Sequence, residues 1–358
     1  MLTKDTKYAF LSIVRMGLGY QEGVLSNNID WDSLETLAKE QGLVGIVIDG
    51  VDKLPEDNRP PQKMIVKWIS FLMKEEARNG YQQKVAKGMA LLFHKNSIRT
   101  YVLKGDVVAE CYPRPEHRVS VDLDCYLLPE GEKFDAWNRG NEIIKSKGYK
   151  IETDHYKNST FYLPKLMVEN HRFMVPFRGN KRLKALEQLL QSWMHADTAL
   201  QRFEGTWLFR PPVMVSALFL IEHAYTHFLH EGLTWRYVLD WMMFKKKHED
   251  EIAWPNLEVL INQFGFRRFY DSFLRLGRYL LGEMVEDDLT AMDKKMLADV
   301  WTPLDLHETP HGVKGKLALA RSTLRARWKY RDFSPISMPH ALWIQVNGFL
   351  FEKNPTLD

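Results

Sequence analysis

The sequence contains only two cysteines, Cys111 and Cys125, among its 358 residues. They form no CxxC pair and show no zinc-finger spacing, which argues against a disulfide framework and a structural zinc site of that type. So few cysteines are typical of a protein in a reducing compartment.

Long apolar runs are also missing. A membrane helix needs roughly 20 consecutive apolar residues, whereas the best run, Val213 to Ile221, stops at Glu222. The first residues, MLTKDTKYAFLSIVRMG, lack the long apolar core and the small-residue cleavage site of a secretory signal. We therefore expect a cytoplasmic protein that does not bind membranes.

Neither sign of charge is in large excess. The formal net charge is only +3, which is too small to indicate nucleic-acid binding by itself. A basic segment at 314–331, which includes Trp328 and Tyr330, could contact RNA or DNA through phosphates and base stacking. A solvated cationic helix face is the commoner role of such a segment, so nucleic-acid binding is an alternative that we do not favour.

Several well-known site patterns are absent as well. The sequence contains no GxSxG, no Walker A motif and no dinucleotide-binding glycine fingerprint. His223 and His227 are four residues apart, a spacing that could bind zinc on a helix, but Ala224-Tyr225-Thr226 between them lacks the glutamate of metalloproteases. We expect these two histidines to pack at a helix interface near the active cleft.

The spacing of apolar residues divides the chain into three regions. Residues 1–95 and 179–358 show mainly helical spacing, whereas residues 96–178 combine helices with short β-rich runs. The runs that we interpret as strands are 98–103, 119–127, 149–154, 159–164 and 166–174. This order predicts an α+β fold, in which a small mixed sheet with packed helices is flanked by N-terminal and C-terminal helical regions.

Two aspartates lie on the polar side of the alternating strand at 119–127. Asp122 and Asp124 share one face, about 7 Å apart along the strand, and aspartate is unusual in strands. The pair could hold Mg²⁺, which prefers oxygen ligands and often completes its shell with substrate phosphates. The plainer interpretation is that both carboxylates are solvated on an exposed strand face.

Lys104 and Gly105 follow the first β-rich run. A glycine between a strand and a helix lets backbone amides approach a phosphate, and a helix N-terminus favours negative charge. Lys104 and Arg118 could add positive charge for phosphates. A tight turn with solvated cations is the plainer interpretation, and the charge of Asp106 would oppose a triphosphate unless that residue only caps the helix.

A third carboxylate is expected on a neighbouring strand. Glu169 fits best because it shares a strand face with His171 in the run 166–174. Asp154, at the end of an earlier run, is the competing candidate.

These residues carry a resemblance to a known family. The run Leu103-Lys104-Gly105, followed by Tyr112-Pro113, Arg118 and Asp122-Leu123-Asp124, resembles the signature of the uncharacterised nucleotidyltransferase family within the DNA-polymerase-β-like superfamily. The pair Glu169-x-His171 resembles that family's next acidic strand. Weaker similarity extends over the N-terminal helices and over 223–240, so the resemblance spans most of the chain.

The resemblance implies a nucleotidyltransferase-like domain over 96–178 and a metal-dependent reaction. Asp122 and Asp124 would bind one or two catalytic Mg²⁺ ions, and Glu169 would bind metal or activate an acceptor hydroxyl. Lys104, Gly105 and Arg118 would orient the phosphates of an NTP substrate, with ATP favoured, whose nucleoside monophosphate passes to an acceptor.

One departure from the superfamily pattern keeps an alternative open. The usual Gly-Ser of the phosphate turn is replaced by Lys104-Gly105, so a serine hydroxyl is missing there. The alternative is a catalytically silent binding protein of the same fold, or an antitoxin-like subunit.

Overall fold

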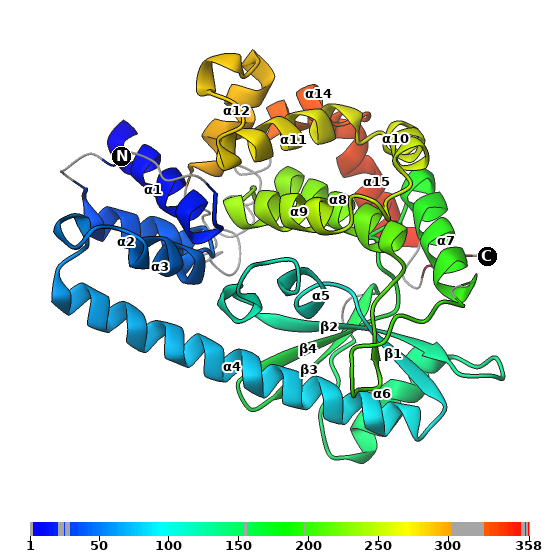
Figure 1. Ribbon diagram of the computed structural model, residues 1–358. Coiled ribbons are helices and arrows are strands. Elements are labelled where there is room, and N and C mark those ends of the chain that lie inside the picture. Colours follow the sequence, from blue (N-terminus) through cyan, green and yellow to red (C-terminus); the bar gives the residue numbers. More distant parts are fainter. Residues whose placement is uncertain are drawn as a thin grey trace, which may run out of the picture.

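A computed structural model describes residues 3–20, 25, 29–153, 156–196, 198–302, 326–351, 355 and 357 (Figure 1). The N-terminal elements are helices, namely α1 (Lys4–Gly17), α2 (Trp31–Glu40), α3 (Val44–Asp52) and the long α4 (Gln62–His94). The central elements are β1 (Ile98–Val102), α5 (Asp106–Ala109), β2 (Asp122–Pro129), α6 (Ala136–Ser146), β3 (Asn158–Leu163) and β4 (Leu166–His171). The remaining elements are α7 (Lys181–Ala196), β5 (Leu208–Phe209), α8 (Val213–His230), α9 (Trp235–Lys247), α10 (Trp254–Gln263), α11 (Arg267–Leu281), α12 (Ala291–Val300), α14 (Arg327–Phe333) and α15 (Met338–Phe351).

The five strands form one mixed sheet in the order β3-β4-β2-β1-β5. Strand β2 is central, antiparallel to β1 and parallel to β4, while β3 closes one edge as an antiparallel neighbour of β4. The predicted α+β class, a small mixed sheet flanked by helices, is therefore confirmed.

Strand ends differ from the predicted ones by up to three residues, and β2 begins at Asp122 instead of 119. Two further features of the sheet also differ from the sequence-based expectation. The described part of the run 149–154, which ends at residue 153, contributes the isolated bridge between Glu152 and Thr160 and forms no strand. The short strand β5 comes from the C-terminal region and pairs in parallel with β1 through Thr100–Leu208 and Tyr101–Phe209. Two residues are too few to show an alternating pattern, so the sequence does not reveal β5.

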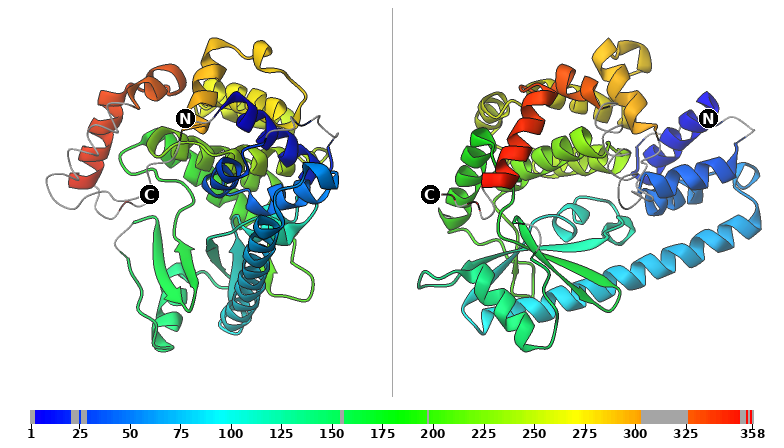
Figure 2. Two further views of the ribbon diagram at one scale, coloured as in Figure 1. Left: turned by 90° about the vertical axis from the view of Figure 1, so that its left-hand side faces the viewer. Right: turned by 180° about the vertical axis from the view of Figure 1, so that it is seen from behind.

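One face of the sheet is covered by α4 and α6 (Figures 1 and 2). Leu123, Cys125 and Leu127 of β2 point to this side and pack into a core with residues of both helices, as their period-two spacing predicts. Helix α6 packs so closely on β2 that a Cβ added to Gly140 would lie 2.3 Å from Leu127 Cδ1.

The opposite face of the sheet lies under α8 and α9 (Figure 1). Tyr126 and Leu128 of β2 join the larger core on this side. Asp122 and Asp124 belong to the same face by strand alternation. The polar side of β2 is thus covered by helices and is not a solvated surface, and Asp124 is only 2% exposed.

The N-terminal and C-terminal helices pack together although the sheet separates them in sequence. The Arg15 guanidinium of α1 donates hydrogen bonds to the carbonyl oxygens of Tyr279 and Leu280 in α11, both at 2.7 Å. The rings of Phe10 and Trp301 also meet edge to face, 6.0 Å between centroids. This joint packing supports α8 and α9 above the sheet, while the division of the chain at 95 and 178 stays a prediction.

The basic segment at 314–331 is described only in part, because residues 314–325 lie outside the described residues. In α14, Lys329 is buried, with Nζ 2.8 Å from the Phe228 carbonyl oxygen and 2.7 Å from an Asp299 carboxylate oxygen. Lys329 and Tyr330 therefore belong to the helical core, whereas the Arg331 side chain is 69% exposed. Among the helices that the structure describes, none is long and apolar enough to cross a bilayer.

Candidate functional site

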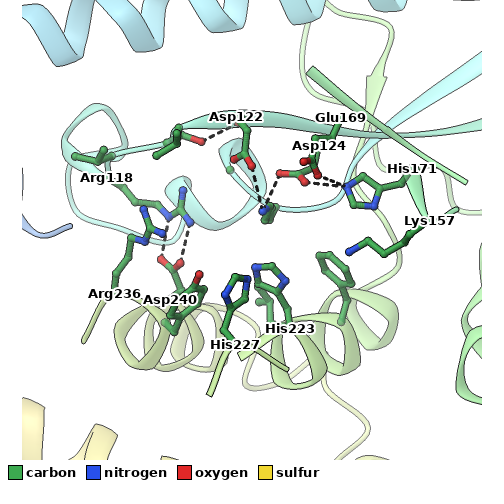
Figure 3. Close-up of a pocket in the computed structure, with 18 residues that line it drawn as sticks. Arg118, Asp122, Asp124, Lys157, Glu169, His171, His223, His227, Arg236 and Asp240 are labelled. Atoms are coloured by element: carbon green, nitrogen blue, oxygen red, sulfur yellow. Dashed lines mark hydrogen bonds and ion pairs between the residues drawn. The ribbon is translucent and has the colours of Figure 1, made fainter. Parts of the chain in front are cut away.

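A cleft of about 260 Å³ lies between the polar face of the sheet and helices α8 and α9 (Figure 3). Strands β2 and β4 form one wall, the turn after β1 contributes to the floor, and α8 and α9 form the opposite wall. The six residues selected from the sequence all line this cleft, namely Lys104, Gly105, Arg118, Asp122, Asp124 and Glu169.

The parallel pairing of β2 and β4 brings acidic groups together. Asp124 lies opposite Glu169 in the register of the two strands. His171, two residues further along β4, places Nε2 2.9 Å from Asp124 Oδ1 and 3.3 Å from Glu169 Oε2. One ligand atom from each of the three residues lies within 4.8 Å of the others. This donor set of two carboxylates and one imidazole fits a divalent cation.

Lys104 lies between the two aspartates of β2. Its Nζ is 3.2 Å from Asp124 Oδ2 and 3.6 Å from Asp122 Oδ2. Burial alone lowers the pKa of a lysine, but the charges of Asp124 and Asp122 outweigh burial and raise the pKa of Lys104 above its ordinary value. The ammonium is therefore a fixed positive charge at the floor of the cleft.

The two aspartates differ in their electrostatic environment. Burial raises the pKa of Asp122, and the nearby Asp124 charge adds to this rise. Burial also opposes ionisation of Asp124, but Lys104 and the His171 hydrogen bond prevail and hold the pKa of Asp124 well below its usual range. Asp124 is thus the permanent anion of the pair, and Asp122 faces the cleft with a weaker hold on its charge.

The turn at Gly105 requires glycine. Its φ of 65° with ψ of −108° lies where residues with a Cβ are strained, and an added Cβ would lie 3.2 Å from Ser120 Oγ. The turn lets the chain pass from Lys104 directly into the four-residue helix α5. The neighbouring Asp106 is largely buried, and burial raises the pKa of its carboxyl group.

Arg118 links the segment before β2 to α9. Its Nε and Nη2 donate to the two carboxylate oxygens of Asp240 at 2.8 and 2.7 Å, and the Tyr112 hydroxyl donates to the same carboxylate at 2.7 Å. Arg118 is buried. The guanidinium lines the cleft, but its positive charge, which the sequence predicts to bind phosphates, is already paired with Asp240.

The α8–α9 wall carries two histidines and a tyrosine (Figure 3). The His223 and His227 rings meet edge to face at 4.5 Å, and His227 stacks on Tyr237 at 4.9 Å between centroids. Burial, reinforced by the charge of Lys104, places the pKa of His223 well below its ordinary value, so this ring is neutral. His227 Nδ1 is 2.7 Å from a carboxylate oxygen of Glu231. The cluster of potential metal ligands found among the described residues does not include either of these histidines.

Helix α4 donates hydrogen bonds to the backbone at the start of β2, next to the cleft. Gln82 Nε2 donates to the Asp122 carbonyl oxygen at 3.0 Å, and Arg78 Nη2 donates to the Ser120 carbonyl oxygen at 2.8 Å. These bonds fix the backbone at the start of β2, where Asp122 and Asp124 lie. The amide and guanidinium donors come from about 40 residues earlier in the chain, and no local pattern predicts them.

His171 is the cleft residue to which the sequence assigns no role. Its signal is present, because it shares a strand face with Glu169, but the contact with Asp124 depends on the β2–β4 pairing. Arg236 and Tyr237 of α9 line the cleft without any such signal. The competing third acid, Asp154, lies outside the described residues.

Comparison with known proteins identifies a family. A family model described as an uncharacterised nucleotidyltransferase matches residues 27–282, a range that includes the sheet and every cleft residue named above. No curated protein and no solved structure matches the chain.

Proposed function

Because the chain belongs to the uncharacterised nucleotidyltransferase family, we propose that it is a Mg²⁺-dependent nucleotidyltransferase. It moves a nucleoside monophosphate from an NTP, with ATP as the favoured donor, to a hydroxyl or phosphate of an acceptor. The observation that carries this proposal is that Asp122, Asp124 and Glu169 line one cleft from two neighbouring parallel strands, with Asp124 opposite Glu169 in the register. Carboxylates so placed are the ligands that Mg²⁺ uses beside substrate phosphates.

The three carboxylates would hold one or two metal ions. A bound Mg²⁺ would supply Lewis-acid polarisation and charge neutralisation at the phosphates. The acceptor oxygen forms a bond to the α-phosphorus, the bond from that phosphorus to the bridging oxygen breaks, and pyrophosphate leaves. Glu169, at the more open side of the ligand set, takes the proton of an acceptor hydroxyl when it is not used as a ligand.

The cations near the turn would orient the phosphates. Lys104 is buried against Asp122 and Asp124, so its ammonium would keep its position while negative charge develops on the phosphates during the reaction. Gly105 has no side chain that would keep a phosphate away from the backbone at the floor of the cleft. Arg118 binds Asp240 and so fixes the segment before β2 against α9.

The acceptor side of the cleft would be formed by α8 and α9. The neutral His223 ring and the His227 ring lie opposite the acidic strands (Figure 3), and Tyr237 stacks on His227. Arg236 of α9 also lines this wall, which therefore offers both ring contacts and a positive charge to an acceptor hydroxyl or phosphate.

The test is a screen of α-labelled NTPs with purified protein, divalent metal and cell extract, with detection of a covalently labelled product. Asp122→Asn and Asp124→Asn should each abolish labelling. Glu130→Gln is a matched control, because Glu130 follows the other end of β2 and pairs with His94 at 3.0 Å, so this variant should retain labelling.

Two outcomes would contradict the proposal. One is labelled product at wild-type level in both aspartate variants. The other is the absence of product together with the absence of MgATP binding at millimolar ligand in calorimetry. The second outcome would favour the silent binding protein, which the pairing of Asp122 and Asp124 with an internal ammonium also accommodates.

A further inference from the structure

We propose that Asp124, Glu169 and His171 together form a histidine-containing site for a single divalent ion, which prefers first-row transition ions such as Mn²⁺ over Mg²⁺. This inference deepens the proposed function, on which it rests for the use of the metal, by naming an additional ligand and the class of ion. The added ligand is the imidazole of His171.

The distances from His171 Nε2 to the two carboxylate oxygens are close to those between neighbouring ligands of one metal ion. With metal–ligand bonds of about 2.1 Å, adjacent ligands of an octahedron lie about 3 Å apart. His171 Nε2 lies 2.9 Å from Asp124 Oδ1 and 3.3 Å from Glu169 Oε2. The imidazole nitrogen therefore stands at the distance from both carboxylate oxygens that two neighbouring ligands of one ion require.

The orientation of His171 also suits a metal ligand. Its Nδ1 lies 3.3 Å from the Phe173 carbonyl oxygen, which can only accept a hydrogen bond, so Nδ1 carries a proton. Nε2 then points into the acidic pair, which is the arrangement that ligating histidines adopt with a backbone carbonyl behind them. Metal binding replaces any proton on Nε2, which leaves to solvent.

The side chain of His171 is buried and fixed in position. It is 2% exposed and sits at the end of β4, so strand pairing with Tyr126 fixes its backbone. A buried imidazole that is aimed between two carboxylates has few roles other than a cation or a metal ligand.

Lys104 limits the site to one ion in the absence of nucleotide. Asp124 uses its two oxygens differently, with Oδ1 toward His171 and Oδ2 toward the Lys104 ammonium, 3.2 Å away. The same ammonium lies 3.6 Å from Asp122. Its positive charge beside both aspartates therefore disfavours a second cation there.

The donor set predicts the preference among ions. Mg²⁺ favours oxygen ligands and retains several waters, whereas an imidazole nitrogen favours first-row transition ions. Two carboxylates keep the site acceptable to Mn²⁺, so Mn²⁺ is both a plausible occupant and a spectroscopic probe.

The test is a Mn²⁺ titration followed by electron paramagnetic resonance, with nitrogen coupling read by electron spin-echo modulation. We expect one Mn²⁺ per wild-type chain and a coupling from a directly bound imidazole nitrogen, which changes when the protein is labelled with ¹⁵N-histidine. Mn²⁺ should bind more tightly than Mg²⁺ in direct competition. His171→Gln should lose the coupling and weaken Mn²⁺ binding roughly tenfold or more.

The control is His223→Gln, on the opposite wall of the same cleft, which should keep the coupling. The inference is overturned if wild-type protein binds no Mn²⁺ or shows no nitrogen coupling, or if the coupling is lost in His223→Gln. If His171→Gln fails to fold, the wild-type coupling and its retention in His223→Gln and in a matched His227→Gln variant decide the question.

The two proposals can fail separately. Labelled product formed by a protein whose bound Mn²⁺ lacks nitrogen coupling would overturn the histidine ligand and leave nucleotidyl transfer intact. Nitrogen-coupled Mn²⁺ in a protein that labels no acceptor with any NTP would overturn nucleotidyl transfer and leave the metal site intact.

Discussion

Single residues in the cleft owe their chemistry to neighbours that are distant in sequence. Asp122 and Asp124 are two residues apart on one strand face, yet their pKa values shift in opposite directions. Asp124 gains His171 from β4 and the nearer contact with Lys104, whereas Asp122 lies farther from Lys104 and is opposed by the charge of Asp124. Identical residue types on one strand thus acquire different roles from packing alone.

Gly105 gives a prediction at the scale of a residue. Gly105→Ala forces a Cβ into a positive-φ turn, where the added atom would lie 3.2 Å from Ser120 Oγ. We expect a loss of about 1–3 kcal/mol in the free energy of unfolding, measured by urea denaturation. Gly80→Ala is the matched control, since a Cβ there meets nothing within 4 Å in the middle of α4, and it should stabilise by about 0.5–1 kcal/mol. Equal effects of the two substitutions would contradict the strained turn.

Elements are joined across the cleft by buried polar contacts. Arg118, before β2, and Asp240, on α9, form a two-pronged ion pair that also receives the Tyr112 hydroxyl. This contact sets the distance between the acidic strands and the wall of histidines. The ion pair therefore contributes more to the placement of these elements than to the free energy of unfolding, because both charges lose their hydration on burial.

Breaking this pair from one side should be costly. Asp240→Asn leaves the buried Arg118 charge without its anion, and we expect a loss of about 3–5 kcal/mol in the free energy of unfolding. The double variant Arg118→Met/Asp240→Leu removes both charges and should recover a large part of that loss. The measurement is chemical denaturation of the three proteins. A double variant less stable than Asp240→Asn would show that the ion pair itself is strongly stabilising.

Helix α7 supplies an element-scale prediction of pH dependence. Glu187 is buried and accepts hydrogen bonds from the backbone N–H groups of Met174 and Val175, in the segment that follows β4. Burial raises the pKa of Glu187 from 4.5 to about 7, although these hydrogen bonds and Gln191 oppose the rise. The folded protein therefore holds this proton more tightly than the unfolded chain does.

The sign of the effect follows from this difference in proton affinity. The contribution of Glu187 is fully present below pH 4.5 and is lost as the pH rises to about 7, on the order of 3 kcal/mol in total. Glu187→Gln, which stays neutral, should flatten the fall in unfolding free energy between these pH values in denaturation measurements. An unchanged pH profile in Glu187→Gln would contradict this account.

At the scale of the whole molecule, the sheet is a layer between two sets of helices (Figure 2). Helices α4 and α6 cover one face, and α8 and α9 cover the other and form the cleft wall. The C-terminal region also adds β5 to the edge of the sheet beside β1. The region 96–178 is therefore completed by residues that follow it in the chain.

Truncation tests this dependence. A fragment of residues 1–178 lacks β5, α8 and α9, so the apolar side chains of β1 and β2 on the cleft side, including Tyr101 and Tyr126, lose their cover. We expect this fragment to lack a cooperative thermal transition, whereas the full chain shows one. The measurement is calorimetry with sedimentation as a check on aggregation. A monomeric fragment with a sharp transition would instead make the first two regions an independent folding unit.

Local pattern was enough to find the acidic strand and six of the residues that line the cleft. Period-two alternation separates Leu123 and Cys125 from Asp122 and Asp124, and the structure places the two sets on opposite faces. The positive φ of Gly105 belongs to the turn that the Lys104-Gly105 pair indicates. These features depend on neighbours within a few residues, which a sequence displays directly.

What the sequence by itself determined is the α+β class, the family resemblance and the acidic positions on β2 and β4. Only the tertiary structure decided that Asp124 meets Glu169 and His171, that Lys104 lies between the aspartates, and that Arg118 is paired with Asp240. It also decided that the polar face of β2 is a covered cleft instead of a solvated surface. The reason is that strand alternation assigns a side chain only to one face of the sheet. Its burial and its charge depend on the strand register and on helices that lie about a hundred residues away in the sequence.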